Sequence, residues 1–240
     1  MTPSERLIVA LHVSSSTAAR KIVSSLADST QIYKVGMQLY TAEGPQVVRD
    51  LCAAGKQVFL DLKYHDIPNT ISAAVREAAQ LGVKILTVHA AGGSKMLRAA
   101  VDAARDIRAE TKIVAVTVLT SMDAADLGET GVQAAVLDQV IRLGSIALDA
   151  GCDGLVSSAQ EIKALRARFG DDFLAVTPGV RPAGAAHGDQ ARVVTPAEAL
   201  AAGATCIVVG RPITAAPDPA HAARQILREL ESSLSRPARH

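Results

Sequence analysis

The 240-residue sequence lacks tryptophan, and its three tyrosines and three phenylalanines make aromatic residues only 2% of the chain. Surfaces that bind single-stranded nucleic acid stack the bases on aromatic side chains, and this sequence can supply few of them. An excess of charge of one sign is also missing, because 25 basic residues face 24 acidic ones and the formal net charge is +1. We therefore expect neither nucleic acid nor a membrane surface among the partners.

Cysteine is scarce as well, and Cys52, Cys152 and Cys206 lie far apart. Their spacing matches no zinc motif, and an odd number cannot form a closed disulfide framework, so free thiols in a reducing compartment are expected. A long apolar run is absent near the N-terminus, where Leu7–Leu11 is too short for a signal peptide or a membrane span. We therefore expect a cytoplasmic protein.

What the chain does have is a regular alternation of short apolar, β-branched runs with longer alanine-rich stretches. The stretches between the runs have the spacing of helices, and glycines stand where those helices should end. The eight runs predicted to be strands are Leu7–Val13, Gln31–Val35, Gln57–Leu62, Lys84–His89, Lys112–Leu119, Gly154–Ser157, Leu174–Thr177 and Thr205–Val209.

Strands that alternate with helices indicate a parallel sheet, because parallel strands need a crossover connection. Eight such units that close on themselves give a (β/α)8 TIM barrel, and the length of the chain suits one. No linker or low-complexity tract interrupts the pattern, so we interpret residues 1–240 as a single α/β barrel domain. A doubly wound open sheet has the same periodicity and remains the alternative.

Charged residues stand at the end of the third apolar run. Asp61 and Lys63 are two positions apart, and side chains two apart in a strand project to the same face. If Leu60 and Leu62 pack outward against helices, Asp61 and Lys63 point into the barrel. Barrel interiors are normally filled by apolar side chains, so charges at this position need an explanation.

Two further charged residues join this pair. Lys34 is embedded in the second run, and Asp66 follows just past the end of the third. Burying any one of these charges alone would be costly, so we expect the two lysines and two carboxylates to pair with one another. They form either a catalytic charge cluster or a structural ion-pair network at the mouth of the barrel.

The last two runs end in parts suited to a phosphate group. Thr177-Pro178-Gly179-Val180-Arg181 ends the seventh run, and Val209-Gly210-Arg211 ends the eighth. Many barrels bind phosphate with the loops after these two strands, where glycine lets backbone N–H groups approach and arginine adds a bidentate contact. The glycine-rich segment 181–190 that follows is typical of an active-site lid, and equally of a loop without function.

These motifs together resemble the bacterial orotidine 5′-monophosphate decarboxylase family over nearly the whole chain. The Asp-x-Lys-x-x-Asp core recurs in related sugar-phosphate decarboxylases and aldolases, whereas its extension and the later segments are more specific. The matching stretches are Tyr33–Gly36, Asp61–Thr70, Val88–Ala90, Thr117–Met122, Thr177–Pro182, Gly188–Gln190 and Val209–Thr214.

The resemblance implies a role for each of the four charged residues. Lys63 would be the acid that protonates C6 of the pyrimidine, and Asp61 would lie beside the substrate carboxylate. Lys34 and Asp66 would complete an alternating array of charges. Asp66 and Thr70 would reach the active site of the neighbouring subunit in a homodimer.

The resemblance also implies the remaining substrate contacts, and it implies neither a metal nor an organic cofactor. Thr120 and Ser121 would meet the pyrimidine, and the glycines and arginines at the ends of the last two strands would hold the phosphate. The full set of further substrate-binding residues predicted in this way is His12, Ile67, Thr70, Thr120, Ser121, Pro178, Arg181, Gln190, Gly210 and Arg211.

One position departs from the family pattern. The first strand of the family usually ends in Ala-Leu-Asp, with the aspartate on a ribose hydroxyl, whereas this chain has Ala10-Leu11-His12. Histidine can still form a hydrogen bond with a hydroxyl, but it brings no fixed negative charge. Two other functions stay open: a metal-dependent sugar-phosphate decarboxylase or aldolase, and a nucleotide-binding barrel silenced at His12.

Overall fold

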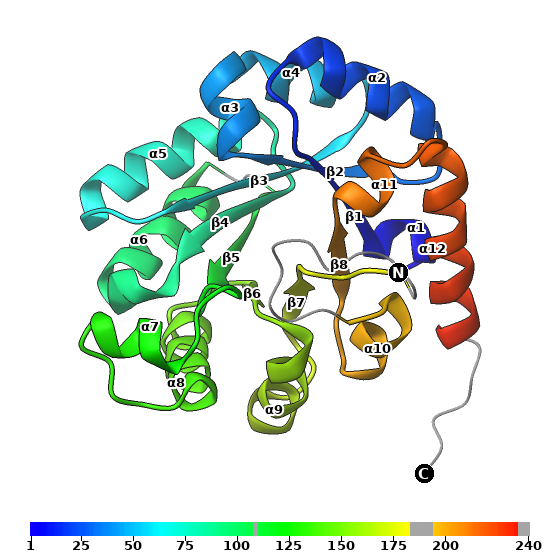
Figure 1. Cartoon of the computed structure of the whole chain (residues 1–240). Coiled ribbons are helices and arrows are strands. Elements are labelled where there is room, and N and C mark those ends of the chain that lie inside the picture. Colours follow the sequence, from blue (N-terminus) through cyan, green and yellow to red (C-terminus); the bar gives the residue numbers. More distant parts are fainter. Residues whose placement is uncertain (108–109, 183–193, 235–240) are drawn as a thin grey trace.

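The computed structural model describes residues 1–107, 110–182 and 194–234. Its eight parallel strands form a closed barrel in which neighbours in sequence are neighbours in space (Figure 1). The predicted TIM barrel is confirmed, and the open-sheet alternative is wrong because β1 pairs with both β2 and β8. The strands are β1 Leu7–Leu11, β2 Ile32–Gly36, β3 Gln57–Tyr64, β4 Ile85–His89, β5 Lys112–Val116, β6 Gly154–Val156, β7 Leu174–Thr177 and β8 Cys206–Val209.

Two of the predicted strands extend two residues or more past the observed C-terminal end of the strand. The first strand was predicted to reach Val13, but it ends at Leu11, and the His12 N–H turns back to the carbonyl of Ala10. The fifth was predicted to reach Leu119, but pairing with the short β6 stops at Val116. In both places the residues beyond the last ladder pair turn toward the mouth of the barrel.

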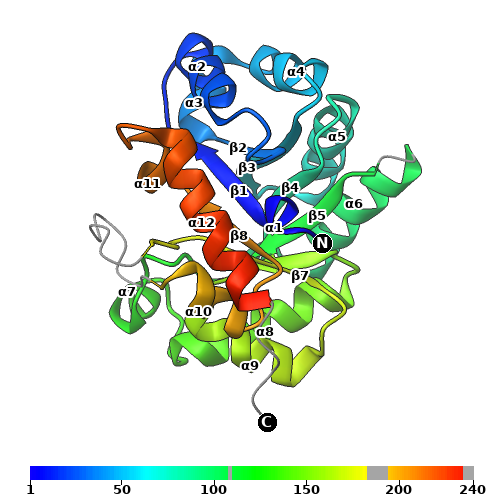
Figure 2. The ribbon, with the colours of Figure 1, turned by 90° about the vertical axis from the view of Figure 1, so that its right-hand side faces the viewer.

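Helices surround the barrel and connect its strands. The last of them, α12, packs against α1, α2 and α10 and closes the outer ring beside β1 and β8 (Figure 2). The helices are α1 Pro3–Arg6, α2 Ser16–Leu26, α3 Met37–Glu43, α4 Gln46–Ala53, α5 Pro68–Gln80, η1 Ala90–Gly92, α6 Gly93–Asp106, α7 Ala124–Glu129, α8 Val136–Asp149, α9 Ala159–Phe169, α10 Pro196–Ala201, α11 Arg211–Thr214 and α12 Pro219–Leu234. No helix in the described ranges combines the length and the apolarity needed to cross a membrane.

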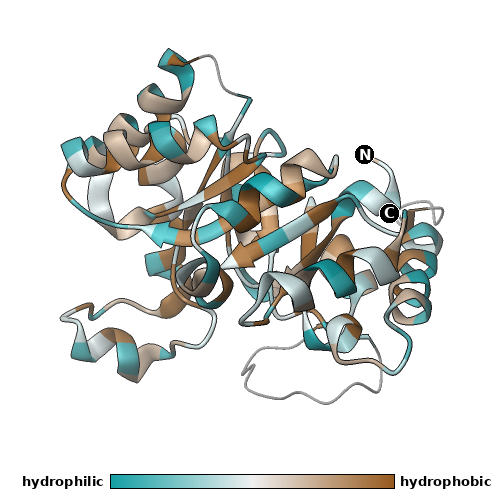
Figure 3. Cartoon of the chain, turned by 90° about the horizontal axis from the view of Figure 1, so that it is seen from above, coloured by the Kyte–Doolittle hydropathy of each residue, from teal (hydrophilic) through white to brown (hydrophobic). Residues whose placement is uncertain are grey.

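The core has two parts, one on each side of the strands. Between strands and helices lies a large aliphatic layer. Figure 3 shows hydrophobic residues along the strands and a mixture of hydrophobic and hydrophilic residues along the helices. Inside the barrel lies a smaller cluster that includes Ile8, Ile32, Phe59 and Ile85. Because side chains alternate along a strand, the position two residues after each of these also faces inward. The barrel interior thus changes from apolar to polar toward the C-terminal ends of the strands.

Candidate active site

A cavity of about 470 Å³ opens at the C-terminal ends of the strands. Its size is within the range usual for small-molecule sites, and its position is the one where barrel enzymes carry their chemistry. Apolar residues from the strands, among them Phe59 and Val116, form part of its wall. The sequence-predicted site residues that line it are His12, Lys34, Asp61, Lys63, Thr120, Pro178, Arg181, Gly210 and Arg211.

Asp61 lies between two lysines on the cavity wall. Its Oδ2 accepts a hydrogen bond from Lys34 Nζ and its Oδ1 accepts one from Lys63 Nζ, both at 2.9 Å. The side chains of Lys34 and Asp61 are each 12% exposed and that of Lys63 is 29% exposed. Burial alone would raise the pKa of Asp61, but the charges and hydrogen bonds of Lys34 and Lys63 outweigh it and lower that pKa. The three groups therefore form a charged cluster with an excess of one positive charge.

Lys63 reaches Asp61 through an irregular strand, not through simple alternation. The register of β3 against β4 pairs Leu60 with Leu86 and then Tyr64 with Val88, so three residues of β3 lie opposite one of β4. Within this bulge Lys63 has φ of 51°, in the left-handed region that costs a non-glycine residue about 1–3 kcal/mol. Asp61 and Lys63 do contact each other as predicted, but the strand between them is irregular, which alternation does not predict.

His12 directly follows the C-terminal end of β1 and lies beside the end of β8. An added Cβ at Gly210 would lie 3.0 Å from His12 Nδ1, so the imidazole covers the glycine closely. Burial, followed by the positive charges of Lys34 and Arg211, lowers the pKa of His12. The ring is therefore neutral near pH 7, and it can offer one donor and one acceptor to a ligand.

Two arginines, Arg181 and Arg211, also line the cavity. Arg181 is only 7% exposed and donates to the carbonyl of Val180 at 3.2 Å. Burial and the nearby charge of Arg211 both lower the pKa of Arg181. Gly179 lies two residues before Arg181 and has φ of 76°, a conformation that favours glycine. Because glycine has no side chain, its backbone is open to a ligand. Two guanidinium groups held close together are suited to an anion with several oxygens, such as phosphate.

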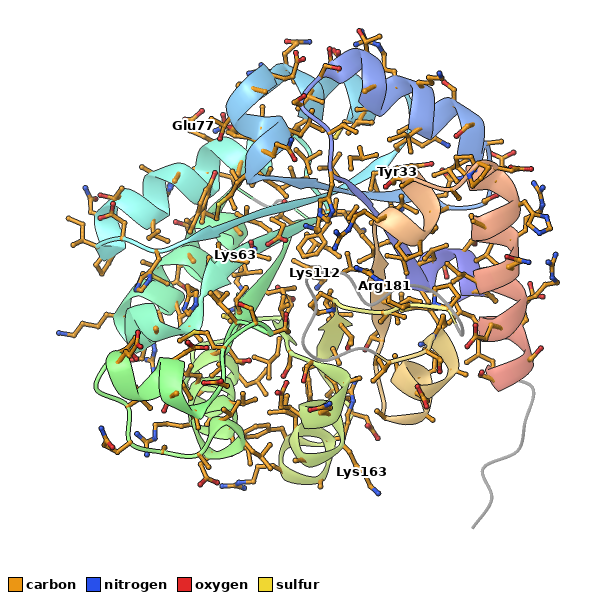
Figure 4. All side chains as sticks on the ribbon, viewed as in Figure 1. Tyr33, Lys63, Glu77, Lys112, Lys163 and Arg181 are labelled. Carbon is orange, nitrogen blue, oxygen red and sulfur yellow. The ribbon has the colours of Figure 1, made fainter. Side chains whose placement is uncertain are left out.

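Figure 4 shows Lys63 and Arg181 toward the centre of the barrel, whereas Glu77 and Lys163 lie on helices at its outer edge. The cavity thus has a lysine–carboxylate cluster on one wall and an arginine pair on another. Such an arrangement can bind a molecule that carries two separate anionic groups.

Some of the predicted site residues do not line the cavity. Asp66, Ile67 and Thr70 are exposed and do not line this cavity, and Ser121 is exposed just beyond it. Asp66 accepts a hydrogen bond from the Ile67 N–H at 2.6 Å, and Ile67 is 66% exposed. The prediction for Gln190 falls outside the described residues, as does most of the predicted lid at 181–190.

The structure also brings in residues that the sequence did not single out. Gln38, in the first turn of α3, lines the cavity, and no motif pointed to it. Phe59 could have been found, because it precedes Asp61 by two positions and so shares its face. Thr87 on β4 contacts both Asp61 and Lys63, and only the three-dimensional register reveals it. In the part of the chain that the structure describes, no group of three or more His, Cys, Asp or Glu side chains is placed to hold a metal ion.

Comparison with known proteins gives a consistent result. The model of the orotidine 5′-phosphate decarboxylase / HUMPS family matches residues 5–226. An orotidine 5′-phosphate decarboxylase of Moorella thermoacetica is 50% identical, with 96% of this chain and 94% of that protein covered. One from Anaeromyxobacter dehalogenans is 52% identical, with 96% and 100% covered.

Solved structures agree with the sequence relatives. The crystal structure of orotidine 5′-phosphate decarboxylase from Lactobacillus acidophilus superposes with a TM-score of 0.84 and 40% identity, and the match covers 94% of this chain and 99% of that one. By the family model and by these relatives, the chain belongs to the orotidine 5′-phosphate decarboxylase / HUMPS family.

Proposed function

We propose that this chain is a carboxy-lyase of pyrimidine biosynthesis, which acts in the cytoplasm and converts orotidine 5′-monophosphate to uridine 5′-monophosphate and CO₂. The observation that carries the proposal is the pair of lysines on Asp61 in a cavity that also holds two arginines. The substrate has an anionic group at each end, a carboxylate on the pyrimidine and a phosphate on the ribose. Family membership and the named relatives support the same reaction.

The chemical difficulty lies in the electron pair that decarboxylation leaves behind. When the bond between C6 and the carboxylate breaks, CO₂ departs and both electrons stay on C6. The ring offers no ordinary resonance for this charge, so fixed charges must stabilise it. Lys63 supplies an ammonium group beside C6 and then transfers a proton from Nζ to that carbon. Asp61 holds the ammonium group of Lys63 in place before the reaction begins. No step requires a cofactor.

The phosphate end supplies binding energy rather than chemistry. Arg181 and Arg211 would hold the phosphate, with the backbone at Gly210 and Pro178 beside them. Binding energy from a remote group can be used to align the reacting carbon in the transition state. In this proposal Thr120 contacts the pyrimidine and His12 contacts the ribose.

The functional unit in this proposal is a homodimer. Asp66 and Thr70 lie outside the cavity of their own subunit, next to the exposed apolar side chain of Ile67. The Lys34–Asp61–Lys63 cluster carries an excess positive charge that one more carboxylate would balance. Asp66 of the neighbouring subunit would supply that carboxylate and complete an alternating array.

The direct test is the loss of orotidine 5′-monophosphate absorbance when enzyme is added, before and after treatment with a metal chelator. Turnover that survives chelation is expected. Turnover that requires added Mg²⁺ would favour the metal-dependent sugar-phosphate decarboxylase or aldolase. Tight binding of uridine 5′-monophosphate without turnover would favour the silenced nucleotide-binding barrel.

The shared active site has a separate test. The variants Lys63→Ala and Asp66→Ala should each be inactive alone, yet mixing them should restore activity, because a mixed dimer contains one site with both residues intact. Subunit exchange is verified by mass spectrometry of differently tagged chains. Activity that stays at the level of the separate variants after exchange would place each site within one subunit.

A further inference from the structure

Thr87 lies at the centre of the distorted part of the barrel. It is a β4 residue with no exposed surface, and it follows Ile85 of the interior cluster by two positions, so its side chain also faces into the barrel. In the register between β3 and β4, Thr87 is the one residue opposite Asp61, Leu62 and Lys63. It therefore stands where the regular ladder between these strands is interrupted.

The hydroxyl of Thr87 replaces the missing ladder contacts. Its Oγ1 accepts a hydrogen bond from the backbone N–H of Lys63 at 2.8 Å. The same hydroxyl donates to Oδ1 of Asp61 at 3.2 Å, the oxygen that also accepts from Lys63 Nζ. One side chain thus fixes the backbone of Lys63 and the carboxylate that holds its ammonium group.

This double contact matters because Lys63 has an unfavourable backbone conformation. At φ of 51° the residue would gain by relaxing to an ordinary strand conformation, which would shift its backbone N–H and its ammonium group from their present positions beside Thr87 and Asp61. A backbone N–H buried without an acceptor would favour the same relaxation. The hydroxyl of Thr87 opposes this relaxation in two ways, because it accepts from the backbone N–H of Lys63 and donates to the carboxylate that binds the Lys63 ammonium group.

We propose that Thr87 is a positioning residue for the reaction, which holds Lys63 in its left-handed conformation and keeps its ammonium group on Asp61. This inference rests on the proposed function, since the reaction of Lys63 is what it serves. Thr87 does not line the cavity, so it acts on the substrate only through Lys63 and Asp61. A small displacement of a catalytic group lowers the rate of the chemical step more than it lowers substrate affinity.

Thr30 provides a matched control at the other end of the barrel. It is also fully buried, and its hydroxyl likewise has two contacts: it donates to the carbonyl of Leu7 at 2.6 Å and accepts from the Ile32 N–H at 3.3 Å. Both of those partners belong to the backbone at the start of strands, away from the cavity. Thr30→Val therefore measures the cost of losing a buried hydroxyl without touching Lys63.

The experiment compares Thr87→Val, Thr87→Ser and Thr30→Val with the parent enzyme. Turnover is measured with orotidine 5′-monophosphate, and binding affinity is measured with uridine 5′-monophosphate. Thr87→Val keeps the shape of the side chain without its hydroxyl, and it should lower kcat by about tenfold to a hundredfold. Its affinity for uridine 5′-monophosphate should stay within about threefold of the parent value, because the phosphate contacts are remote. Thr87→Ser should restore most of kcat, and Thr30→Val should lower the melting temperature while leaving kcat unchanged.

Each other outcome has a definite meaning. A Thr87→Val enzyme with parental kcat, a Thr87→Ser enzyme as slow as Thr87→Val, or equal losses of kcat in Thr87→Val and Thr30→Val would overturn the proposal. If Thr87→Val does not fold, Thr87→Ala replaces it, and failure of both to fold would overturn the proposal by making the hydroxyl a determinant of folding. A parent chain without turnover would instead refute the proposed function.

Discussion

The barrel has lysine–carboxylate contacts at both of its ends, and their distances do not distinguish them. Near the C-terminal end, Lys63 Nζ lies 2.9 Å from Asp61, and at the N-terminal end Lys112 Nζ lies 2.9 Å from Asp153. Figure 4 labels both lysines. The difference is in burial: Lys112 and Asp153 are 49% and 27% exposed, whereas Asp61 is 12% exposed and is shared with Lys34.

This difference in burial separates a contact that is suited to a structural role from one that is suited to the proposed chemistry. An exposed pair such as Lys112–Asp153 contributes about 0–1 kcal/mol to stability, because water screens it. A buried cluster with an unbalanced charge is costly to assemble, and replacing such groups by apolar residues is often neutral or stabilising. The buried cluster at the C-terminal end is thus better explained by its chemistry than by stability. The predictions below test that contrast.

The largest effect is expected when Lys63 is removed. Lys63→Ala should lower kcat/KM for orotidine 5′-monophosphate by at least about a thousandfold, since the proton donor and the main cation beside C6 are lost together. Steady-state kinetics measure this, and uridine 5′-monophosphate should still bind. The matched control Lys112→Ala removes a lysine with the same 2.9 Å contact and should keep parental kinetics. A Lys63→Ala enzyme with a tenth of parental turnover would contradict the role of Lys63.

A smaller effect is expected at the arginine pair, which in the proposed function binds the phosphate and takes no part in the chemical step. Arg211→Ala should weaken nucleotide binding by about 1.5–3 kcal/mol, the usual value of a hydrogen bond to a charged group. That is roughly a tenfold to hundredfold rise in the dissociation constant, measurable by calorimetry. Arg224→Ala, an exposed arginine on α12, is the control. Equal kcat/KM for orotidine and its monophosphate in the parent enzyme would show that the phosphate contributes nothing.

A gain of function is expected at His12. An aspartate would accept a hydrogen bond from the ribose hydroxyl through a charged oxygen. Such bonds exceed neutral ones by roughly 1–1.5 kcal/mol, so His12→Asp should raise kcat/KM by about fivefold to tenfold. His221→Asp, an exposed histidine on α12, should change nothing. The gain should shrink for a substrate analogue without ribose hydroxyls. If His12→Asp is neutral or harmful, His12 belongs to a locally different ribose site.

The smallest effect concerns the dependence of stability on pH. Burial, Lys34 and Arg211 hold the pKa of His12 below its ordinary value of 6.5, so the unfolded chain binds a proton there more readily than the folded one. The free energy of unfolding should therefore decrease as the pH falls below about 6.5, and His12→Asn should reduce that decrease. Urea unfolding at pH 7 and pH 5 measures it, with His221→Asn as the control. An identical pH dependence in His12→Asn and the parent would show that another group is responsible.

The sequence by itself determined the parallel α/β architecture and the charged residues of the site, whereas the pairing of β1 with β8 in the structure closes the sheet into a barrel. Short apolar runs separated by helical stretches indicate a parallel sheet, because each parallel strand needs a crossover. Lys34 and Asp61 could be placed inside because they interrupt interior-facing positions of those runs. That residues 1–240 form a single domain stays a prediction, as do the chemical roles of the site residues.

Only the tertiary structure decided how Lys63 meets Asp61. Alternation predicts a shared face, but it cannot predict that three residues of β3 lie opposite Thr87 alone, or that Lys63 takes φ of 51°. Local sequence does not encode such a conformation, since it is unfavourable for lysine in isolation. It exists because contacts from β4 and from the carboxylate of Asp61 hold it, and those contacts form only when the strands are side by side.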